Sequence, residues 1–210
     1  MSTIKSSTEH LTLNADGSGK DIKFQANGVE KASISSTGVM TATSYAGDGS
    51  ALTGVGGITE ADQWRLTTSF TGDSNPITTN LERVDTDGFG KLGTGMSEAS
   101  GVFSFPSTGV WKIEASAYFI STAANNYQGL EIHTTTDNST YDNASHGFGS
   151  IHGSGAYSYV TPTFIFDVTN TSTHKVRFRV AVASGATAVT CYGDTGRNRT
   201  SFTFTKLGDT

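Results

Sequence analysis

The aromatic residues of this chain are distributed so unevenly that they limit where a hydrophobic core can form. The 210-residue sequence contains 12 Phe, 7 Tyr and 2 Trp, yet only Phe24 and Tyr45 precede Gly57. Aromatic side chains supply much of the area that a folded protein buries. We therefore expect one core after residue 57, and a leader over residues 1–57 that must bury its apolar residues against other chains.

The leader alternates short apolar segments with turn-forming residues. Asn27-Gly28 lies between "IKFQA" and "VEKASI" and favours a type I′ hairpin, because both central residues of that turn need positive φ. A lone hairpin is only marginally stable in water, so we expect identical chains to wrap together. The residues buried between them would be Leu11, Leu13, Ile22, Phe24, Val29, Ile34 and Met40. The alternative is a disordered Gly/Ser-rich linker.

A longer run of the leader, within residues 10–55, resembles a known class of protein. The sequence "LTLNADGSGKDIKFQANGVEKASISSTGVMTATSYAGDGSALTGV" is similar to the shaft segments of bacteriophage tail fibres, especially those of marine and cyanobacterial phages. In such fibres three chains run in parallel, and "GDGSALTGV" leads into a separate globular tip. The resemblance implies a trimeric shaft over residues 1–57, attached to other virion proteins through its N-terminus. The glycine-rich "SYAGDGSALTGVGG" would be the joint between shaft and head.

The segment after this joint, "ITEADQWRL", is expected to form a short helical linker over residues 58–66. Thr59 can cap a helix N-terminus, and the carboxylates of Glu60 and Asp62 suit its first turn. One or two helical turns would then precede a head that begins at residue 67.

The pattern from residue 67 to residue 210 is typical of an all-β domain. Charged residues make up only 16% of the chain, which also contains 25 Gly, so turn and strand formers dominate. Two segments alternate strictly between apolar and polar residues. The apolar face of one consists of Trp111, Ile113, Ala115 and Ala117, and that of the other consists of Val176, Phe178 and Val180. At least six such strands predict an antiparallel β-sandwich, with a jelly roll as the leading version.

This region also resembles a known family. In "GVFSFPSTGVWKIEASAYF", Phe103, Pro106, Gly109 and Trp111 match the turn and aromatic-led strand of the complement-type heads among the tumour necrosis factor-like jelly rolls. The ending "SFTFTKLG" is similar to that family's last strand. The resemblance spans roughly residues 67–208 and implies a compact homotrimer that presents binding loops outward.

Charge and hydropathy exclude several classes of partner. The net charge of −5 and the pI near 5.4 argue against nucleic-acid binding, which needs a basic surface. The start "MSTIKSST" has no apolar signal-peptide core, and no run approaches the ~18 apolar residues of a membrane helix. We expect a virion protein made in the host cytoplasm and not inserted in a membrane. The single Cys191 is expected to be a buried small residue without a role.

The sequence predicts no enzyme, cofactor or metal site. It contains no G-x-S-x-G, H-E-x-x-H or paired Cys motif. A glycan depolymerase is the enzymatic alternative, in which Glu114 and Glu131 would face each other on neighbouring strands. The four His residues of the head lack the spacing of strand-borne metal ligands, and the oxygens of Asp137, Asn138, Asp142 and Asn143 could bind calcium but equally suit turns.

The segment over residues 137–156 is the leading candidate for recognition, as a long loop or as a further strand. Aromatic faces stack on sugars, while His and Asn supply hydrogen bonds, so the candidates for receptor or glycan binding here are Tyr141, His146, Phe148 and His152. Arg197 and Arg199 are further candidates in a locally basic C-terminal segment, whose cations could instead form ion pairs.

These observations together predict a function. We expect a homotrimeric, non-enzymatic phage fibre whose head recognises the host surface. The alternative is a capsid-borne head fibre or decoration protein.

Overall fold

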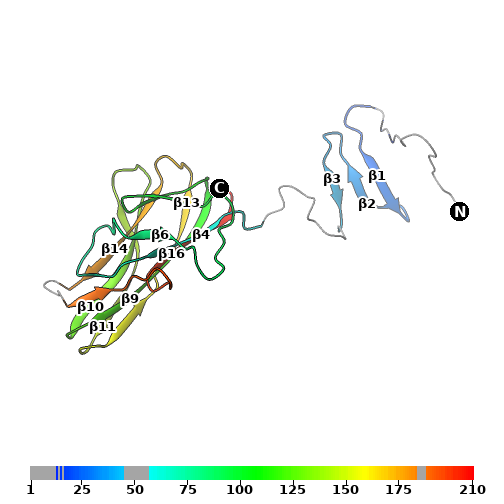
Figure 1. The fold of residues 1–210 in the computed structure, drawn as a ribbon. Helices are drawn as coiled ribbons and strands as arrows, with labels where there is room; N and C mark the ends of the chain where they lie inside the picture. Colours follow the sequence, from blue (N-terminus) through cyan, green and yellow to red (C-terminus); the bar gives the residue numbers. More distant parts are fainter. Residues whose placement is uncertain (1–12, 14, 16, 45–56, 184–187) are drawn as a thin grey trace. The chain divides into compact units, whose positions relative to one another are not determined.

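The computed structural model describes residues 13, 15, 17–44, 57–183 and 188–210. The chain divides into two compact units, Met1–Val55 and Gly56–Thr210, which we describe separately. Every paired strand in both units is antiparallel, and the described residues form no helix, so the predicted all-β class is confirmed (Figure 1). Within that part of the chain, no helix long and apolar enough to cross a membrane is present. The expected attachment segment over residues 1–10 lies outside the described residues.

The N-terminal unit contains a three-stranded sheet. Its strands β1 (Ile22–Ala26), β2 (Val29–Ile34) and β3 (Met40–Ala42) are adjacent in that order (Figure 1). The turn between β1 and β2 has φ of 51° at Asn27 and 74° at Gly28. The predicted hairpin is therefore confirmed, and its positive φ angles are those of a type I′ turn.

This small sheet leaves much of its apolar surface exposed. The register places Ile34 opposite both Ile22 and Met40, and Phe24 opposite Ala32, so these side chains share one face. Phe24 is 42% exposed and Met40 is 57% exposed. The trimeric shaft that would cover them stays a prediction.

The predicted helical linker is wrong, because its residues enter the head as a strand. Strand β4 (Ala61–Leu66) begins within the segment 58–66. Asp62 and Leu66 are buried, and Trp64 packs against the core, which is the two-residue period of a strand. The carboxylates of Glu60 and Asp62 do not serve a helix N-terminus but accept hydrogen bonds from the backbone N–H groups of residues 94–96, at 2.8–3.1 Å.

The head consists of two sheets. The five-stranded sheet has the order β11 (Asp142–Ile151), β10 (Asn125–Thr135), β14 (Lys175–Val182), β8 (Val102–Ser104) and β7 (Ser97–Ala99). The eight-stranded sheet has the order β5 (Phe70–Thr71), β15 (Val189–Cys191), β9 (Gly109–Ser121), β16 (Ser201–Gly208), β4 and β6 (Leu81–Arg83). Strands β12 (Tyr157–Val160) and β13 (Thr163–Val168) lie outside this order and also pair with β9.

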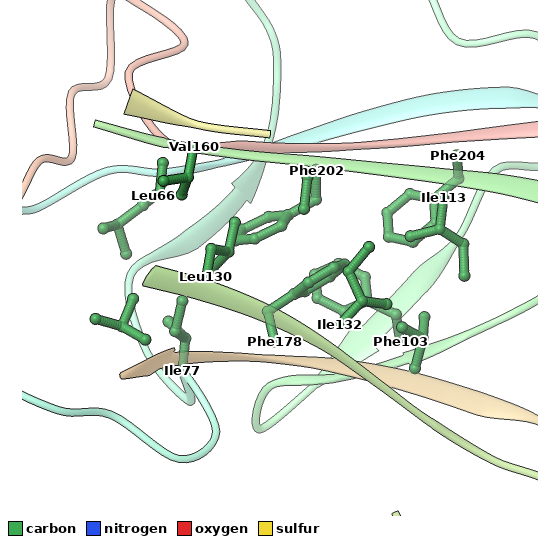
Figure 2. Close-up of a cluster of buried hydrophobic side chains, with 14 of the residues drawn as sticks. Leu66, Ile77, Phe103, Ile113, Leu130, Ile132, Val160, Phe178, Phe202 and Phe204 are labelled. Carbon is green, nitrogen blue, oxygen red and sulfur yellow. The ribbon is translucent and has the colours of Figure 1, made fainter. Parts of the chain in front are cut away.

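The core lies between these sheets. The alternation predicted for β9 and β14 is confirmed, since the seven side chains expected inside are at most 2% exposed. Figure 2 shows Phe202 and Phe204 of β16 pointing toward Phe178 of β14 and Leu130 of β10. The rings of Phe178 and Phe202 stack with centroids 4.0 Å apart. Half of the segment over residues 137–156 is strand, because β11 occupies ten of its residues and forms an edge of the five-stranded sheet.

The Phe103–Pro106–Gly109–Trp111 motif has a physical basis in this fold. Gly109 has a φ of 140°, and a Cβ atom there would lie 2.5 Å from the carbonyl oxygen of Gly208 on β16. The indole Nε1 of Trp111 donates to the carbonyl of Ser107 at 3.3 Å and so holds the turn. Glycine is required because β16 passes close to the backbone at the start of β9.

Replacing Phe178 by Ala should lower the free energy of unfolding by about 3–5 kcal/mol, because a cavity would form between the sheets. Urea unfolding followed by intrinsic fluorescence would measure the change. Asn126→Ala, at an exposed position of β10, is the matched control and should change stability little. A Phe178→Ala loss no larger than that of the control would contradict this description of the core.

Cys191 should resist thiol reagents in the folded protein. It is 1% exposed, and burial raises the pKa of its thiol to about 12. Because the thiolate is the reactive form, a neutral thiol should react with iodoacetamide at pH 8 only after denaturation. Mass spectrometry would measure the labelled fraction, and rapid labelling of the native protein would disprove the prediction.

Candidate functional site

The outward face of strands β11, β10 and β14 carries an unusual mixture of side chains. Leu130, Ile132, Phe178 and Val180 fill the core, so their neighbours along β10 and β14 point outward. The register sets two rows across the three strands: Phe148, Gly129 and Ala181 form one, and His146, Glu131 and Arg179 form the other. A row with two very small residues thus lies beside a row of titratable groups.

These rows form a hollow of about 410 Å³, which we call the β10 hollow. Its lining residues are Tyr127, Glu131, Phe148, Arg179 and Ala181. The small side chain of Ala181 leaves space in the hollow. Phe148 lies over Gly129, where a Cβ atom would collide with Cδ1 of the ring. The volume is within the range of about 300–1,000 Å³ that is typical of small-molecule sites.

One side of the β10 hollow is aromatic. The rings of Tyr127 and Phe148 meet edge to face, with centroids 5.6 Å apart and an interplanar angle of 87°. The imidazole of His146 lies 5.0 Å from the Phe148 ring. Tyr127 is 43% exposed and Phe148 is 45% exposed, so both offer apolar surface to a ligand.

The other side of the β10 hollow is polar. Glu131 is only 5% exposed although it points away from the core. Its Oε2 accepts a hydrogen bond from Nε2 of His133 at 2.6 Å and lies 3.5 Å from Nη1 of Arg179. Nη2 of Arg179 also lies 3.3 Å from Oδ1 of Asp73. Both of the Glu131 contacts are made by Oε2, so neither of them engages Oε1.

The structure brings together only part of the predicted site in the segment 137–156. Phe148 lines the β10 hollow and His146 lies beside it, both on β11. Tyr141 lies elsewhere, with the guanidinium of Arg177 4.1 Å from the centre of its ring, and burial raises the pKa of its hydroxyl. His152 follows the end of β11 and contacts Ser150 Oγ at 3.3 Å.

Arg197 and Arg199 do not form one site with Phe148. Arg199 pairs with Asp194 at 3.1 Å and lies over the ring of Tyr192 at 5.4 Å. Arg197 lines a separate hollow of about 450 Å³ with Gln63 and Asn198 among its walls. For Arg199, the ion-pair alternative is therefore what the structure shows.

A second unusual surface lies on the eight-stranded sheet. We call it the tyrosine face, and it consists of Tyr118, Tyr157, Tyr159 and Tyr192 on and beside β9, β12 and β15. The rings of Tyr118 and Tyr157 stack with centroids 5.2 Å apart, and Tyr192 lies 5.6 Å from Tyr118. Tyr157 is 59% exposed and Tyr159 is 57% exposed.

The arrangement of carboxylates does not match a glycosidase pair. Glu114 lies on β9, where it pairs with Lys112 at 2.8 Å, whereas Glu131 lies on β10 of the other sheet. Both point away from the core, so they face opposite sides of the sandwich. No group of three or more His, Cys, Asp or Glu side chains suited to a metal ion occurs in the part of the chain that the structure describes.

Asp137, one of the possible calcium ligands, serves a turn. Its Oδ1 accepts hydrogen bonds from the backbone N–H groups of Thr140 and Ser139, both at 2.8 Å, and from the Thr135 hydroxyl at 2.7 Å. These bonds, with that from Thr140 foremost, hold the pKa of the Asp137 carboxyl well below its usual range. Asp137 therefore stabilises a turn, which was the alternative to calcium binding for this residue.

Sequence reasoning missed most of the β10 hollow. The sequence analysis does not identify Tyr127, Gly129 or Ala181, and it considers Glu131 only as a possible catalytic group. The alternation of β10 and β14 places these residues on outward faces. Their proximity depends on the pairing of β10 with both neighbours, which one sequence does not specify.

The head is similar to solved structures of one fold. No protein-family model and no characterised protein sequence matches the chain. Murine APRIL, solved at pH 5.0, is 12% identical and covers 70% of this chain and 98% of its own, with a TM-score of 0.52. The Eiger TNF of S. frugiperda is 10% identical and covers 71% of this chain and 93% of its own, with a TM-score of 0.53. The head has a tumour necrosis factor-like jelly-roll fold. The fold expected from the Phe103–Trp111 motif is thereby confirmed.

Gly129→Ala should displace Phe148 and destabilise the head by about 1–3 kcal/mol, since the new methyl group would collide with the ring and with the carbonyl of Gly147. Gly153→Ala is the matched control, because a Cβ atom there meets nothing within 4 Å. Thermal unfolding of both variants would measure the effect. Equal stability of the two variants would show that Phe148 does not rest on Gly129.

Proposed function

We propose that this protein is a homotrimeric, non-enzymatic bacteriophage fibre located in the virion, and that its head binds the surface of the host cell. The observation that supports it best is the contrast between the two outward faces of the head. One carries the tyrosine face, and the opposite one carries the β10 hollow. The first suits association between copies, and the second suits a ligand.

The tyrosine face supports trimer formation. Tyrosine is enriched in protein interfaces because its large ring packs well while its hydroxyl stays polar. Ile165 of the neighbouring β13 is also 54% exposed and extends the apolar surface of the same sheet. The tumour necrosis factor-like proteins that the head resembles form compact homotrimers. The leader resembles shafts of three parallel chains, so the same stoichiometry suits both units.

The β10 hollow supports recognition. The two outer faces of a sandwich point in opposite directions, so association through the tyrosine face leaves the hollow open to a ligand. Its aromatic and hydrogen-bonding side chains fit a binding role, and the separation of Glu114 from Glu131 offers no carboxylate pair for glycan hydrolysis.

Adsorption and location test the virion role. The labelled full-length protein should adsorb to some strains in a panel of marine cyanobacteria and compete with phage for them. Labelled antibodies should mark the distal tail in electron micrographs of virions. Label on the capsid would instead favour a head fibre or decoration protein, and no adsorption to any strain that the phage infects would refute the recognition role.

The oligomer should have three times the chain mass of 22.0 kDa at micromolar concentration. Replacing both Tyr157 and Tyr159 by Asp should weaken association of the head, because charges would have to be desolvated in the interface. Sedimentation measures the mass of the full-length oligomer and the weakened association of a head fragment that begins at Gly57. Phe148→Asp, on the opposite face, is the control and should leave the mass unchanged, whereas a monomeric full-length chain would refute the proposal.

A further inference from the structure

The fold does not by itself explain the polar side of the β10 hollow. The outward positions of a strand usually carry solvated groups, yet Glu131 is 5% exposed there. Removing a carboxylate from water costs free energy unless its partners compensate for the loss. Such departures from local rules concentrate at functional sites. Both contacts of this carboxylate, with His133 and Arg179, are made by Oε2, so Oε1 is a candidate contact for a ligand.

We infer that the β10 hollow binds one neutral pyranose ring of a cell-surface polysaccharide. The inference rests on the proposed recognition role of the head and adds the class of ligand. Three properties of the hollow support it: an aromatic wall, a paired acceptor and donor opposite that wall, and a charge balance that disfavours anionic sugars.

The aromatic wall fits the apolar face of a sugar ring. A pyranose presents several C–H groups on one face, and these pack against the negative face of an aromatic ring. Tyr127 and Phe148 pack edge to face, and Phe148 also lies against Gly129, so little side-chain freedom would be lost on binding.

The opposite wall fits the hydroxyl groups at the edge of the ring. Oε1 of Glu131 can accept a hydrogen bond from a hydroxyl, and the guanidinium of Arg179 can donate one. Neighbouring hydroxyls of a sugar each donate and accept, so they can satisfy both groups together. Hydrogen bonds to charged partners are stronger than those between neutral groups.

The charge balance selects among sugars. Arg179 is paired with two carboxylates, Glu131 and Asp73, at 3.5 and 3.3 Å. The carboxylate of a uronic or sialic acid would be repelled by these two carboxylates. An ammonium group would have to be desolvated beside the Arg179 guanidinium. A neutral ring avoids both costs.

Saturation-transfer NMR on the full-length protein tests the ligand class with defined probes. The neutral probes are the methyl glycosides of glucose, galactose and mannose, the anionic probes those of glucuronic and sialic acid, and the cationic probe that of glucosamine. At least one neutral probe should bind, and more tightly than any charged probe. Binding of charged probes alone, or of none, would overturn the inference.

Variants place the binding in the β10 hollow. Ala181→Leu should fill the floor and abolish the signal, and Phe148→Ala should weaken binding at least about tenfold. Glu131→Gln should weaken it also, while His152→Ala, outside the hollow, is the matched control. Melting temperatures and oligomer mass would show that the variants remain folded. Unchanged binding by both folded Ala181→Leu and Phe148→Ala would refute the site.

Cell adsorption separates this inference from the proposed function. If the wild type adsorbs to cyanobacterial cells and Ala181→Leu does so equally, the head recognises the host through another surface and only the sugar site is wrong. If the wild type does not adsorb to any strain that the phage infects, the recognition role itself fails. Loss of adsorption in Ala181→Leu alone supports both.

Discussion

The head depends on the aromatic contact that joins its two sheets. Phe178 of β14 stacks on Phe202 of β16, and Phe103 lies 5.6 Å from Phe178 and 5.3 Å from Phe204. Each ring fixes which face of its strand is internal. Once those faces are set, every second residue of β9, β10 and β14 must point outward, and the two outer surfaces of the head follow from the same packing.

Much of the fold could be predicted because strand alternation is a local property. A few neighbouring residues suffice to predict that Trp111 and Ile113 point inward and that Asn27-Gly28 forms a turn. The prediction of a helix over residues 58–66 is wrong because acidic residues after a Thr have two explanations. They occur at helix N-termini, but they also occur in strands whose carboxylates accept hydrogen bonds from a distant loop, as Glu60 and Asp62 do here. That loop is more than 30 residues away in the sequence, so no pattern near Glu60 or Asp62 predicts the contact.

The candidate site could be predicted only in part, for the same reason. Residue type alone points to Phe148 and His146, because their segment lacks clear periodicity. Tyr141 and His152 had the same chemistry but lie in other surroundings. The partners that give Phe148 a site come from β10 and β14, and the small size of Gly129 and Ala181 matters only once those strands are side by side. Whether a sheet surface has a hollow depends on which residues the strand register places side by side, and no single segment determines that.

The entry of the chain into the head has a mechanical consequence. The leader joins β4, which is paired with β16 on one side and β6 on the other, and Asp62 holds this strand through Arg83 Nε at 3.0 Å and the Met96 N–H at 2.8 Å. A pull on the leader along the strand therefore loads both ladders in shear, with many hydrogen bonds sharing the force. An edge strand pulled sideways would instead open bond by bond. A force applied to the head along the axis of β4 would therefore have to break both ladders together.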